Sequence, residues 1–349
     1  MSDLKTLTTT IQHNCHISDA QFAGQYTLCV FLLKMREYYR WEKGIPLSHP
    51  LPRKPLGDWL TAREAFWDEL DTQSFAPLTI HGQTYDPFDT AAINQHLLPL
   101  GYVYSGGIGV YHKPYFFLGR LEKSASQGDI TLLVSAEEYA RDLVAPPAML
   151  LDDTVFIRKE SLRRVIWERI EEWHYKKRQD TPMARALACY QKNPSTEDME
   201  TILDLFTANE LEAVLLHEAG EAQATELLGQ AWEELLDTLP RSRAELLARA
   251  VRDHLADCLS TLPVLVETEN TPSLHFYFAN FNGMRRELFP EALEAYQGWV
   301  DSGNLMPLKR LYQSGRQRWQ ALAQQMLDLH RQHTANLAEA IESLCHVGP

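Results

Sequence analysis

A histidine and two glutamates lie close together in the segment Leu215–Ala222, at spacings that bring them to one side of a helix. His217 and Glu221 are one helical turn apart and line the edge of the apolar face, whereas Glu218 falls in the middle of that face. A carboxylate that points into a core costs several kcal/mol unless it is paired or bound to a metal ion. The sequence therefore predicts a partner for Glu218.

A second helix, expected over residues 241–262, shows the same anomaly. His254 lies inside its apolar stripe, and Asp257 lies at the edge of the stripe three residues later. Because only residues 230–240 connect the two helices, we expect them to be spatial neighbours. Imidazole and carboxylate ligands without thiolates suit zinc, iron, manganese or nickel. The expected ligands of one divalent metal ion, with zinc as the first choice, are His217, Glu221, His254 and Asp257.

The pattern His217-Glu218-x-x-Glu221 resembles the His-Glu-x-x-His motif of the zincin metallopeptidases, with glutamate in place of the second histidine. The resemblance covers these five residues only. It implies that His217 and Glu221 bind zinc and that Glu218 activates a water molecule as the general base. His254 or Asp257 would complete the site. The leading expectation is thus a metal-dependent hydrolase, with a peptide or amide bond as the first guess for its substrate.

Two other interpretations stay open. In one, the site residues are not catalytic: either His217 and Glu221 form an ordinary surface pair, with Glu218 half-exposed and His254 a hydrogen-bonded core histidine, or residues 217–221 and 253–257 form the buried polar network of a non-catalytic helical scaffold or binding protein. In the other, the pairs Glu218-x-x-Glu221 and His254-x-x-Asp257 supply two helices of a carboxylate-bridged di-metal centre of the ferritin-like kind. Further ligands of that centre would come from the C-terminal helix, at His330, His333, Glu339 and Glu342.

Two pairs near the N-terminus also have chemical potential. Cys15 and His16 could form a nucleophile pair or a metal site, although adjacent residues point apart and a loop cysteine beside a capping histidine is the simpler expectation. Arg36 and Arg40 share one helical face and could clamp an anion. Ion pairs with neighbouring glutamates are the simpler expectation for these arginines.

The opening Asn14-Cys15-His16-Ile17-Ser18-Asp19-Ala20 and the run Arg40-Trp41-Glu42 resemble the start of an uncharacterised family of bacterial hypothetical proteins. This resemblance covers only about the first 45 residues. It implies no activity and no mechanism.

The elements that must position these residues divide the chain into a mixed part and a helical part. β-forming runs between residues 78 and 135, around a turn at Gly106-Gly107, predict a small antiparallel sheet with hairpins. We expect Ala145-Pro146-Pro147 to link an N-terminal α+β domain, residues 1–145, to a C-terminal helical domain, residues 148–349, that carries the candidate site. The expected fold class is α+β and mainly helical.

Three local expectations complete this picture. Residues 18–43 are predicted to form one helix that ends at Gly44. Thr207 and Glu210 fit a capping box at the start of the first site helix. Leu274–Phe278 is expected as an isolated β-like run among helices.

Composition limits the classes of function. The 349 residues carry a formal net charge of −14, which argues against nucleic-acid or anionic-membrane partners, because both rely on clustered positive charge. The five cysteines are scattered and include no C-x-x-C pair, which favours a reducing compartment. The sequence shows neither a signal peptide nor an apolar run of the ~20 residues that span a bilayer. A cytoplasmic location is therefore expected, and the oligomeric state stays open.

Overall fold

The computed structural model describes residues 2–109, 112–127, 130–176, 180–191, 198–332 and 336–345. The chain separates into two compact units: Met1–Glu168 with Asp198–Thr207, and Arg169–Glu197 with Ala208–Pro349. The linker expected at Ala145-Pro146-Pro147 lies inside the first unit, because the strands that follow it pair with the sheet of that unit.

The first unit begins with three helices, α1 (Ser2–Phe22), α2 (Leu28–Glu42) and α3 (Arg53–Asp68). The single helix expected over residues 18–43 is wrong, because the chain leaves the helical path after Phe22 and enters α2 only at Leu28. Gly24 lies at this break, and a glycine inside a helix costs about 1 kcal/mol relative to alanine. A short 3₁₀ turn, Ala23–Gln25, takes the place of the continuous helix.

The strands of the first unit form a short hairpin and a five-stranded sheet. Their bounds are β1 (Leu78–Ile80), β2 (Gln83–Tyr85), β3 (Tyr102–Ile108), β4 (Pro114–Gln127), β5 (Ile130–Arg141), β6 (Ala148–Leu151) and β7 (Thr154–Arg158). The order in the larger sheet is β3-β4-β5-β7-β6, and neighbouring strands are antiparallel except for the parallel pair β5 and β7. The small antiparallel sheet expected in the N-terminal part is confirmed, with this one parallel pair as an addition.

The turn expected at Gly106-Gly107 is wrong, because both glycines lie inside β3, opposite Phe116 and Tyr115 of β4. A Cβ on Gly106 would lie 2.2 Å from the Pro87 carbonyl oxygen, and one on Gly107 would lie 2.6 Å from the Tyr115 hydroxyl oxygen. The glycines therefore serve close packing within the sheet rather than a reversal of the chain.

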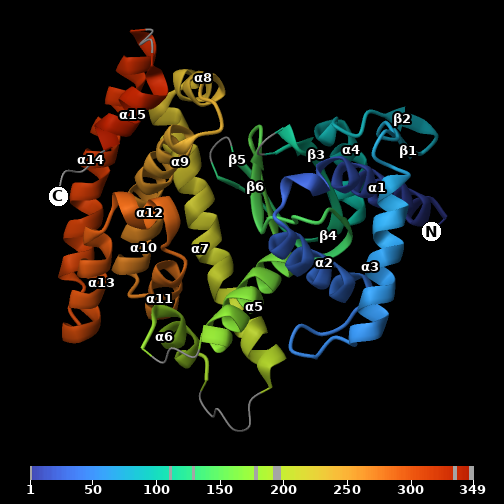
Figure 1. Cartoon of the computed structure of the whole chain (residues 1–349), viewed down its shortest axis with the longest axis horizontal. Helices are drawn as coiled ribbons and strands as arrows, with labels where there is room; N and C mark the ends of the chain where they lie inside the picture. Colours follow the sequence, from blue (N-terminus) through green and yellow to red (C-terminus); the bar gives the residue numbers. More distant parts are fainter. Residues whose placement is uncertain are drawn as a thin grey trace. The chain divides into compact units, whose positions relative to one another are not determined.

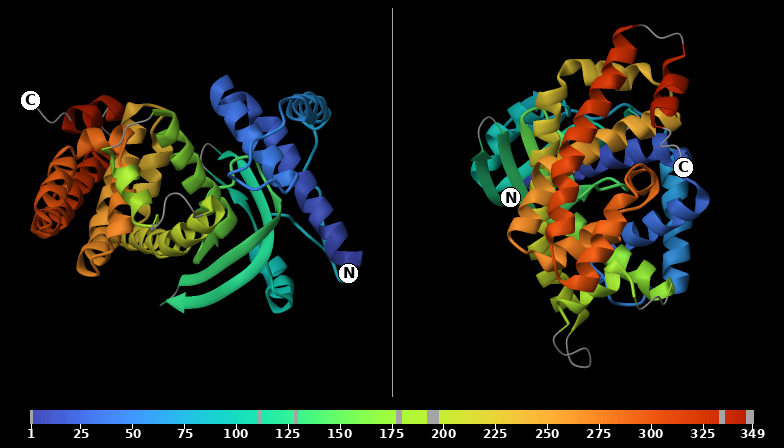
Figure 2. Two further views of the ribbon diagram at one scale, coloured as in Figure 1. Left: turned by 90° about the horizontal axis from the view of Figure 1, so that it is seen from below. Right: turned by 90° about the vertical axis from the view of Figure 1, so that its left-hand side faces the viewer.

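Helix α1 lies across one face of the curved sheet and contacts β4 and β5 (Figure 1, Figure 2). Register shifts along β4 and β5, near Gly119, mark the irregular pairing that accompanies this curvature. Ile11 and Cys15 of α1 are fully buried against Phe116 and Leu118 of the sheet. The N-terminal segment, polar as it is in composition, thus supplies one layer of the core of the first unit. Helix α4 (Thr90–Leu97), also in the first unit, contacts β3.

All the regular secondary structure in the described residues of the second unit is helical. The helices that lie in it, wholly or in part, are α5 (Lys159–Lys176), α6 (Pro182–Ala188), α7 (Met199–Leu228), α8 (Gln230–Thr238), α9 (Arg243–Ala256), α10 (Leu262–Glu267), α11 (Thr271–Ala279), α12 (Gly283–Leu288), α13 (Glu291–Ser302), α14 (Met306–Arg331) and α15 (Leu337–Cys345). Its core includes the fully buried Trp232 and Trp319. The mainly helical α+β fold class is therefore confirmed.

The isolated β-like run expected at Leu274–Phe278 is wrong, because these residues belong to α11. The Asn270 side chain accepts a hydrogen bond from the Ser273 backbone N–H at 3.3 Å and caps this helix. Aromatic residues fit strands well, but burial against neighbouring helices overrides that preference here. Within the described ranges, none of the helices has the length and apolar composition that a membrane crossing requires.

Candidate functional site

The predicted site residues lie where α7 passes the end of α9. Gly220 of α7 makes this close approach possible, because a Cβ at this position would lie 2.4 Å from the Ala256 carbonyl oxygen. The chain after Ala256 forms a π-helical segment, η4 (Asp257–Thr261), before it reaches Pro263. A π-turn suits this place, because proline has no N–H to donate and its ring disturbs the preceding α-helical turn. Asp257 thereby comes within hydrogen-bond reach of His217.

His217 lies between two carboxylates. Its Nδ1 is 2.9 Å from Asp257 Oδ1, and its Nε2 is 3.5 Å from Glu221 Oε1. Burial alone would lower the pKa of His217, but these two carboxylates outweigh burial and hold the pKa well above its usual value. His217 is therefore an imidazolium at neutral pH, and its side chain is 31% exposed.

Asp257 is the best-connected member of the cluster, with only 1% of its surface exposed. Oδ1 faces His217, while Oδ2 accepts hydrogen bonds from the Tyr277 hydroxyl at 2.9 Å and from Arg285 Nη2. Burial alone would raise the pKa of Asp257, but Arg285 and His217 hold it well below its usual range. Both carboxylate oxygens of Asp257 are thus occupied by side chains of the protein. We call His217, Glu221, Arg252, Asp257, Tyr277 and Arg285 the Asp257 cluster.

The two glutamates of the motif have different surroundings. Glu221 accepts a hydrogen bond from Arg252 Nη2 at 3.2 Å, and burial is outweighed by His217 and Arg252, so that its pKa is lowered. Glu218 is 9% exposed and makes no hydrogen bond or ion pair with any described residue. Burial and the neighbouring charge of Glu221 raise the pKa of Glu218 to about 7. The expected partner for Glu218 is therefore missing from the described part of the chain.

His254 takes a different direction from the other predicted ligands. Its Nε2 is 2.9 Å from the Arg285 carbonyl oxygen, and its ring stacks on Trp319 at a centroid distance of 4.7 Å. Phe281 and Phe289 surround the ring further. Burial and the nearby Arg285 lower the pKa of His254 to about 4, so the ring is neutral. His254 is a core histidine that donates to a backbone carbonyl.

The predicted residues do not assemble into a metal centre of three or more ligands. In the described ranges no group of three His, Cys, Asp or Glu side chains is arranged to hold one metal ion. Asp257 is taken up by Arg285 and Tyr277, and Glu221 by Arg252, while His254 binds a backbone oxygen. A zinc site needs three or four protein ligands, and the donor set here does not fit that need.

In the Asp257 cluster, positively and negatively charged side chains from several elements alternate and contact one another. Glu221 and His217 lie on α7, Asp257 begins η4, and Tyr277 and Arg285 come from α11 and α12. Each carboxylate contacts a cation, and each contact joins two elements or two turns of one helix. Such a network holds helices at fixed positions, because separating any pair leaves a buried charge without its partner.

The cations of the Asp257 cluster other than His217 were not among the predicted site residues. Arg252 lies on α9 and pairs with Glu221 of α7, a contact that its position in the sequence does not indicate. Arg285 lies in the first turn of α12, and nothing in its spacing points to Asp257. Tyr277 lay in the run that was expected to be β-like, so its helical face could not be assigned.

The di-metal interpretation relied on the C-terminal helix, where the structure places two helices, α14 and α15. His330 lies at the end of α14, and Glu339 is exposed on α15, where it accepts a hydrogen bond from Asn336 at 3.0 Å. His333 lies outside the described residues. Among the described residues, Glu339 belongs to no group of three His, Cys, Asp or Glu side chains that could hold a metal ion.

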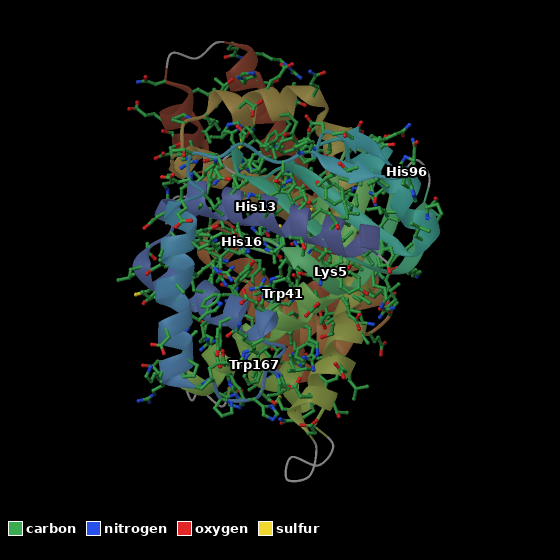
Figure 3. The ribbon with its side chains drawn as sticks, turned by 90° about the vertical axis from the view of Figure 1, so that its right-hand side faces the viewer. Lys5, His13, His16, Trp41, His96 and Trp167 are labelled. Carbon is green, nitrogen blue, oxygen red and sulfur yellow. The ribbon has the colours of Figure 1, made fainter. Side chains whose placement is uncertain are left out.

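Cys15 and His16 point in different directions, as expected for adjacent residues. Cys15 is fully buried, donates to the Phe116 carbonyl at 3.2 Å, and has its pKa raised by burial. His16 lies on α1 (Figure 3), and its ring is in contact with Arg63 and Trp67 of α3. Burial and Arg63 lower the pKa of His16 to about 3. A thiolate–imidazolium pair is therefore absent at these two positions.

Arg36 and Arg40 both contact Glu37, at 2.7 Å and 3.3 Å. Arg40 Nη1 also donates to the backbone carbonyls of Pro46 and His49. The ion pairs expected with a neighbouring glutamate are confirmed for Glu37. Arg40 in addition fixes the loop that follows α2.

Comparison with known proteins identifies a family without assigning a reaction. A family model for the N-terminal domain of a family of unknown function (DUF6866) matches residues 6–158, and the model for its C-terminal domain matches residues 163–347. No curated protein and no solved structure matches the chain significantly. The resemblance to an uncharacterised family thus agrees with the match, whereas the zincin resemblance receives no support. The chain contains both domains of the DUF6866 family and belongs to it.

Proposed function

We propose that this chain is a non-catalytic binding protein whose second unit is a helical scaffold braced by the Asp257 cluster. One observation carries the proposal: both oxygens of the buried Asp257 are bound by side chains from other elements. A carboxylate in that state is neither a free metal ligand nor a free base. It serves instead to fix α7, α11 and α12 against the end of α9.

The state of His217 supports the same function. A general base must be able to accept a proton at neutral pH, but the carboxylates of Asp257 and Glu221 keep His217 protonated. Asp257, in turn, is held ionised by Arg285. These are the protonation states that maximise attraction within the network.

The metal-dependent hydrolase, with zinc at His217 and Glu221 and Glu218 as the general base, stays a prediction, as does the di-metal alternative. One feature is in its favour: Asp257 binds Nδ1 of His217 and leaves Nε2 toward Glu221, as a carboxylate behind a metal-bound histidine does. The contacts of Asp257 with Arg285 and of Glu221 with Arg252 weigh against it.

The variant Glu218→Gln separates the scaffold from the metal-dependent alternatives. In the scaffold, this substitution removes a buried, poorly partnered carboxylate, so the melting temperature at pH 8 rises and the metal content stays near zero. A di-metal ligand at this position would lose bound metal on substitution. A zincin-like base would leave the metal bound but lower turnover of a peptide or amide substrate by about 10²–10⁴-fold. Either of these last two outcomes would overturn the scaffold proposal.

We further propose that the protein acts in the cytoplasm without a nucleic-acid or membrane partner. The net charge of −14 supports this. All five cysteines are free, which suits a reducing compartment. Fractionation of cells that express the untagged chain would test the location, and recovery in the membrane fraction would contradict it.

A further inference from the structure

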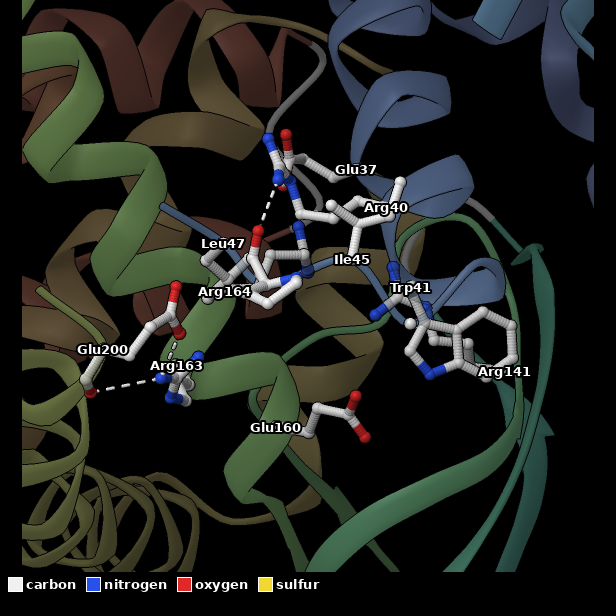
Figure 4. A pocket seen from close by; sticks show the side chains of 12 residues that line it. Glu37, Arg40, Trp41, Ile45, Leu47, Arg141, Glu160, Arg163, Arg164 and Glu200 are labelled. Carbon is white, nitrogen blue, oxygen red and sulfur yellow. Dashed lines mark hydrogen bonds and ion pairs between the residues drawn. The ribbon is translucent and has the colours of Figure 1, made fainter. Parts of the chain in front are cut away.

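The first unit contains a cavity of about 320 Å³ that is lined by four arginines. It lies between the end of α2 and its following loop, the end of β5, the start of α5 and the first turn of α7, all within the first unit (Figure 4). Its volume is at the lower end of the range for small-molecule sites. Its size therefore suits a ligand of few atoms.

Three of the four arginines are fixed by partners in the protein. Arg40 donates to the Pro46 and His49 carbonyls, Arg163 pairs with Glu200 at 2.6 Å, and Arg164 pairs with Glu168 at 2.6 Å. Arg164 Nη2 also donates to the carbonyl oxygens of Val144 and Ala145. These arginines shape the cavity, and their charges are largely compensated.

Arg141 is the exception. Its Nε and Nη2 are buried and have no hydrogen-bond partner in the described part of the chain, and its Nη1 is 3.9 Å from the nearest oxygen of Glu138. Its side chain is only 2% exposed. The guanidinium lies over the Trp41 ring at 5.0 Å and the Tyr38 ring at 5.7 Å, and Figure 4 shows Arg141 beside Trp41 at the cavity. Cation–π contacts compensate only part of the cost of burying a charge.

The charged groups around Arg141 leave its guanidinium without a full negative countercharge, which an anion would supply. Burial and repulsion by Arg164 lower the pKa of Arg141. Glu160, which also lines the cavity, has its pKa raised to about 7 by burial and by Glu138, so it does not supply a full negative charge at neutral pH. The oxygens of Glu138 are turned mainly to Arg158, at 2.6 and 3.0 Å. A positive excess thus remains at Arg141.

We propose that this cavity binds a small organic anion, a carboxylate or a phosphate monoester, whose charged group contacts Arg141. The planar guanidinium suits both groups, since it offers parallel N–H donors to two oxygens. Trp41, Ile45 and Leu47 form an apolar wall of the same cavity, on which the carbon skeleton of the ligand packs. This inference is independent of the Asp257 cluster, which lies in the other unit.

The test is isothermal titration calorimetry of the full chain with benzoate, phenyl phosphate and benzamide. Benzoate and benzamide have similar shapes and differ in charge, so saturable binding of benzoate without binding of benzamide is expected. The comparison of benzoate with phenyl phosphate shows which anion the cavity prefers. Absence of saturable binding of both anions at about 10 mM, a concentration that detects even weak complexes, would overturn the proposal, and so would equal binding of benzamide.

Substitutions then locate the binding. Arg141→Gln should weaken binding of the preferred anion by about 10- to 100-fold, the usual worth of a charge-assisted contact. Arg120→Gln is the matched control, because Arg120 lies on β4, is 48% exposed and does not line the cavity. Equal weakening by Arg120→Gln, or none by Arg141→Gln, would contradict the assignment.

If Arg141→Gln does not fold, a second pair of variants still tests whether the anion binds in this cavity. Leu47 is half-buried at the cavity, so Leu47→Glu and Leu47→Gln differ at this position by one charge and little else. Leu47→Glu should weaken anion binding at least tenfold relative to Leu47→Gln, because its carboxylate competes with the ligand for the arginines. Equal affinities of the two variants would place the anion elsewhere. The scaffold proposal is tested by metal content and the anion site by ligand binding. The two proposals can therefore fail independently of each other.

Discussion

Substitution of Asp257 by asparagine tests how much the Asp257 cluster contributes to stability. The carboxylate is buried and accepts from His217, Tyr277 and Arg285. Asparagine keeps the size of the side chain but has one acceptor oxygen, so its NH₂ group must face His217 or Arg285, both of which are donors. Loss of one partner from a buried, hydrogen-bonded ion pair costs about 3–5 kcal/mol. Because the amide retains part of the hydrogen bonding, we expect a loss of about 3 kcal/mol in the free energy of unfolding.

The assay is urea-induced unfolding at pH 7, followed by tryptophan fluorescence and circular dichroism. Asp253→Asn is the matched control, because Asp253 precedes Asp257 by one turn. Among the residues that the structure describes, Asp253 pairs only with Arg252, at 3.5 Å, and burial raises the pKa of Asp253, so the folded protein disfavours its charge. We expect Asp253→Asn to change the free energy of unfolding by less than about 0.5 kcal/mol or to stabilise the protein slightly.

The pH dependence supplies an independent check. The pKa of Asp257 is held below its unfolded value, so the stabilisation is fully present above a pH of about 4 and is lost as the pH falls further. The difference between wild type and Asp257→Asn should therefore shrink below a pH of about 4. A loss under about 1 kcal/mol at pH 7, or an equal loss in Asp253→Asn, would refute the view that Asp257 braces the helices.

Two further predictions concern neighbouring positions on α7. Glu210 is buried, accepts a hydrogen bond from Ser273 at 2.8 Å, and has its pKa raised by burial to about 7, so the stability that its protonated side chain contributes is present below pH ~4.5 and is lost as the pH rises through 7. Glu210→Gln should therefore be more stable than wild type by about 3 kcal/mol at pH 8 and equally stable at pH 4. A stability difference in thermal melts that does not change with pH would contradict this prediction. Gly220→Ala should destabilise the protein by about 1–3 kcal/mol, because its Cβ would meet the Ala256 carbonyl at 2.4 Å, whereas Gly298→Ala on α13, with its nearest neighbour atom at 3.8 Å, should stabilise it slightly in the same urea assay.

The residue pattern within short segments predicts the fold class correctly. It does not predict where the individual helices and strands begin and end. The alternating β-forming runs predicted the sheet, since a strand's two-residue period is visible within a few residues. The capping box expected at Thr207 and Glu210 is wrong, because α7 begins at Met199 and Thr207 Oγ1 donates to the Leu203 carbonyl inside the helix. Glu210 instead reaches Ser273 on α11. A capping motif is a local signal, and packing of the preceding turn overrides it.

The candidate site shows the same limit at longer range. The helical wheel placed His217 and Glu221 on one face and indicated that Asp257 lies nearby, because these are properties of two adjacent helices. It gave no information on Arg285 or Tyr277, whose positions depend on how later helices pack. His254 illustrates the ambiguity of a histidine on an apolar face: the same spacing fits a metal ligand and a ring that stacks on tryptophan.

Arg141 was not predicted as a functional residue, although Arg40 at the same cavity was considered as an anion ligand. Arg141 ends β5, and its closeness to Trp41 of α2 depends on long-range packing that no motif records. The feature that marks Arg141 is a buried guanidinium with two unpaired nitrogen atoms, which exists only in the folded structure and leaves no pattern in the sequence.

Metal analysis of the untagged protein, combined with thermal melts in the presence of a strong chelator, shows whether ion pairs or a metal ion hold the second unit together. We expect well under about one equivalent of any divalent metal ion and the same melting temperature with and without the chelator. About one bound equivalent, removed by the chelator together with a clear fall in melting temperature, would contradict it.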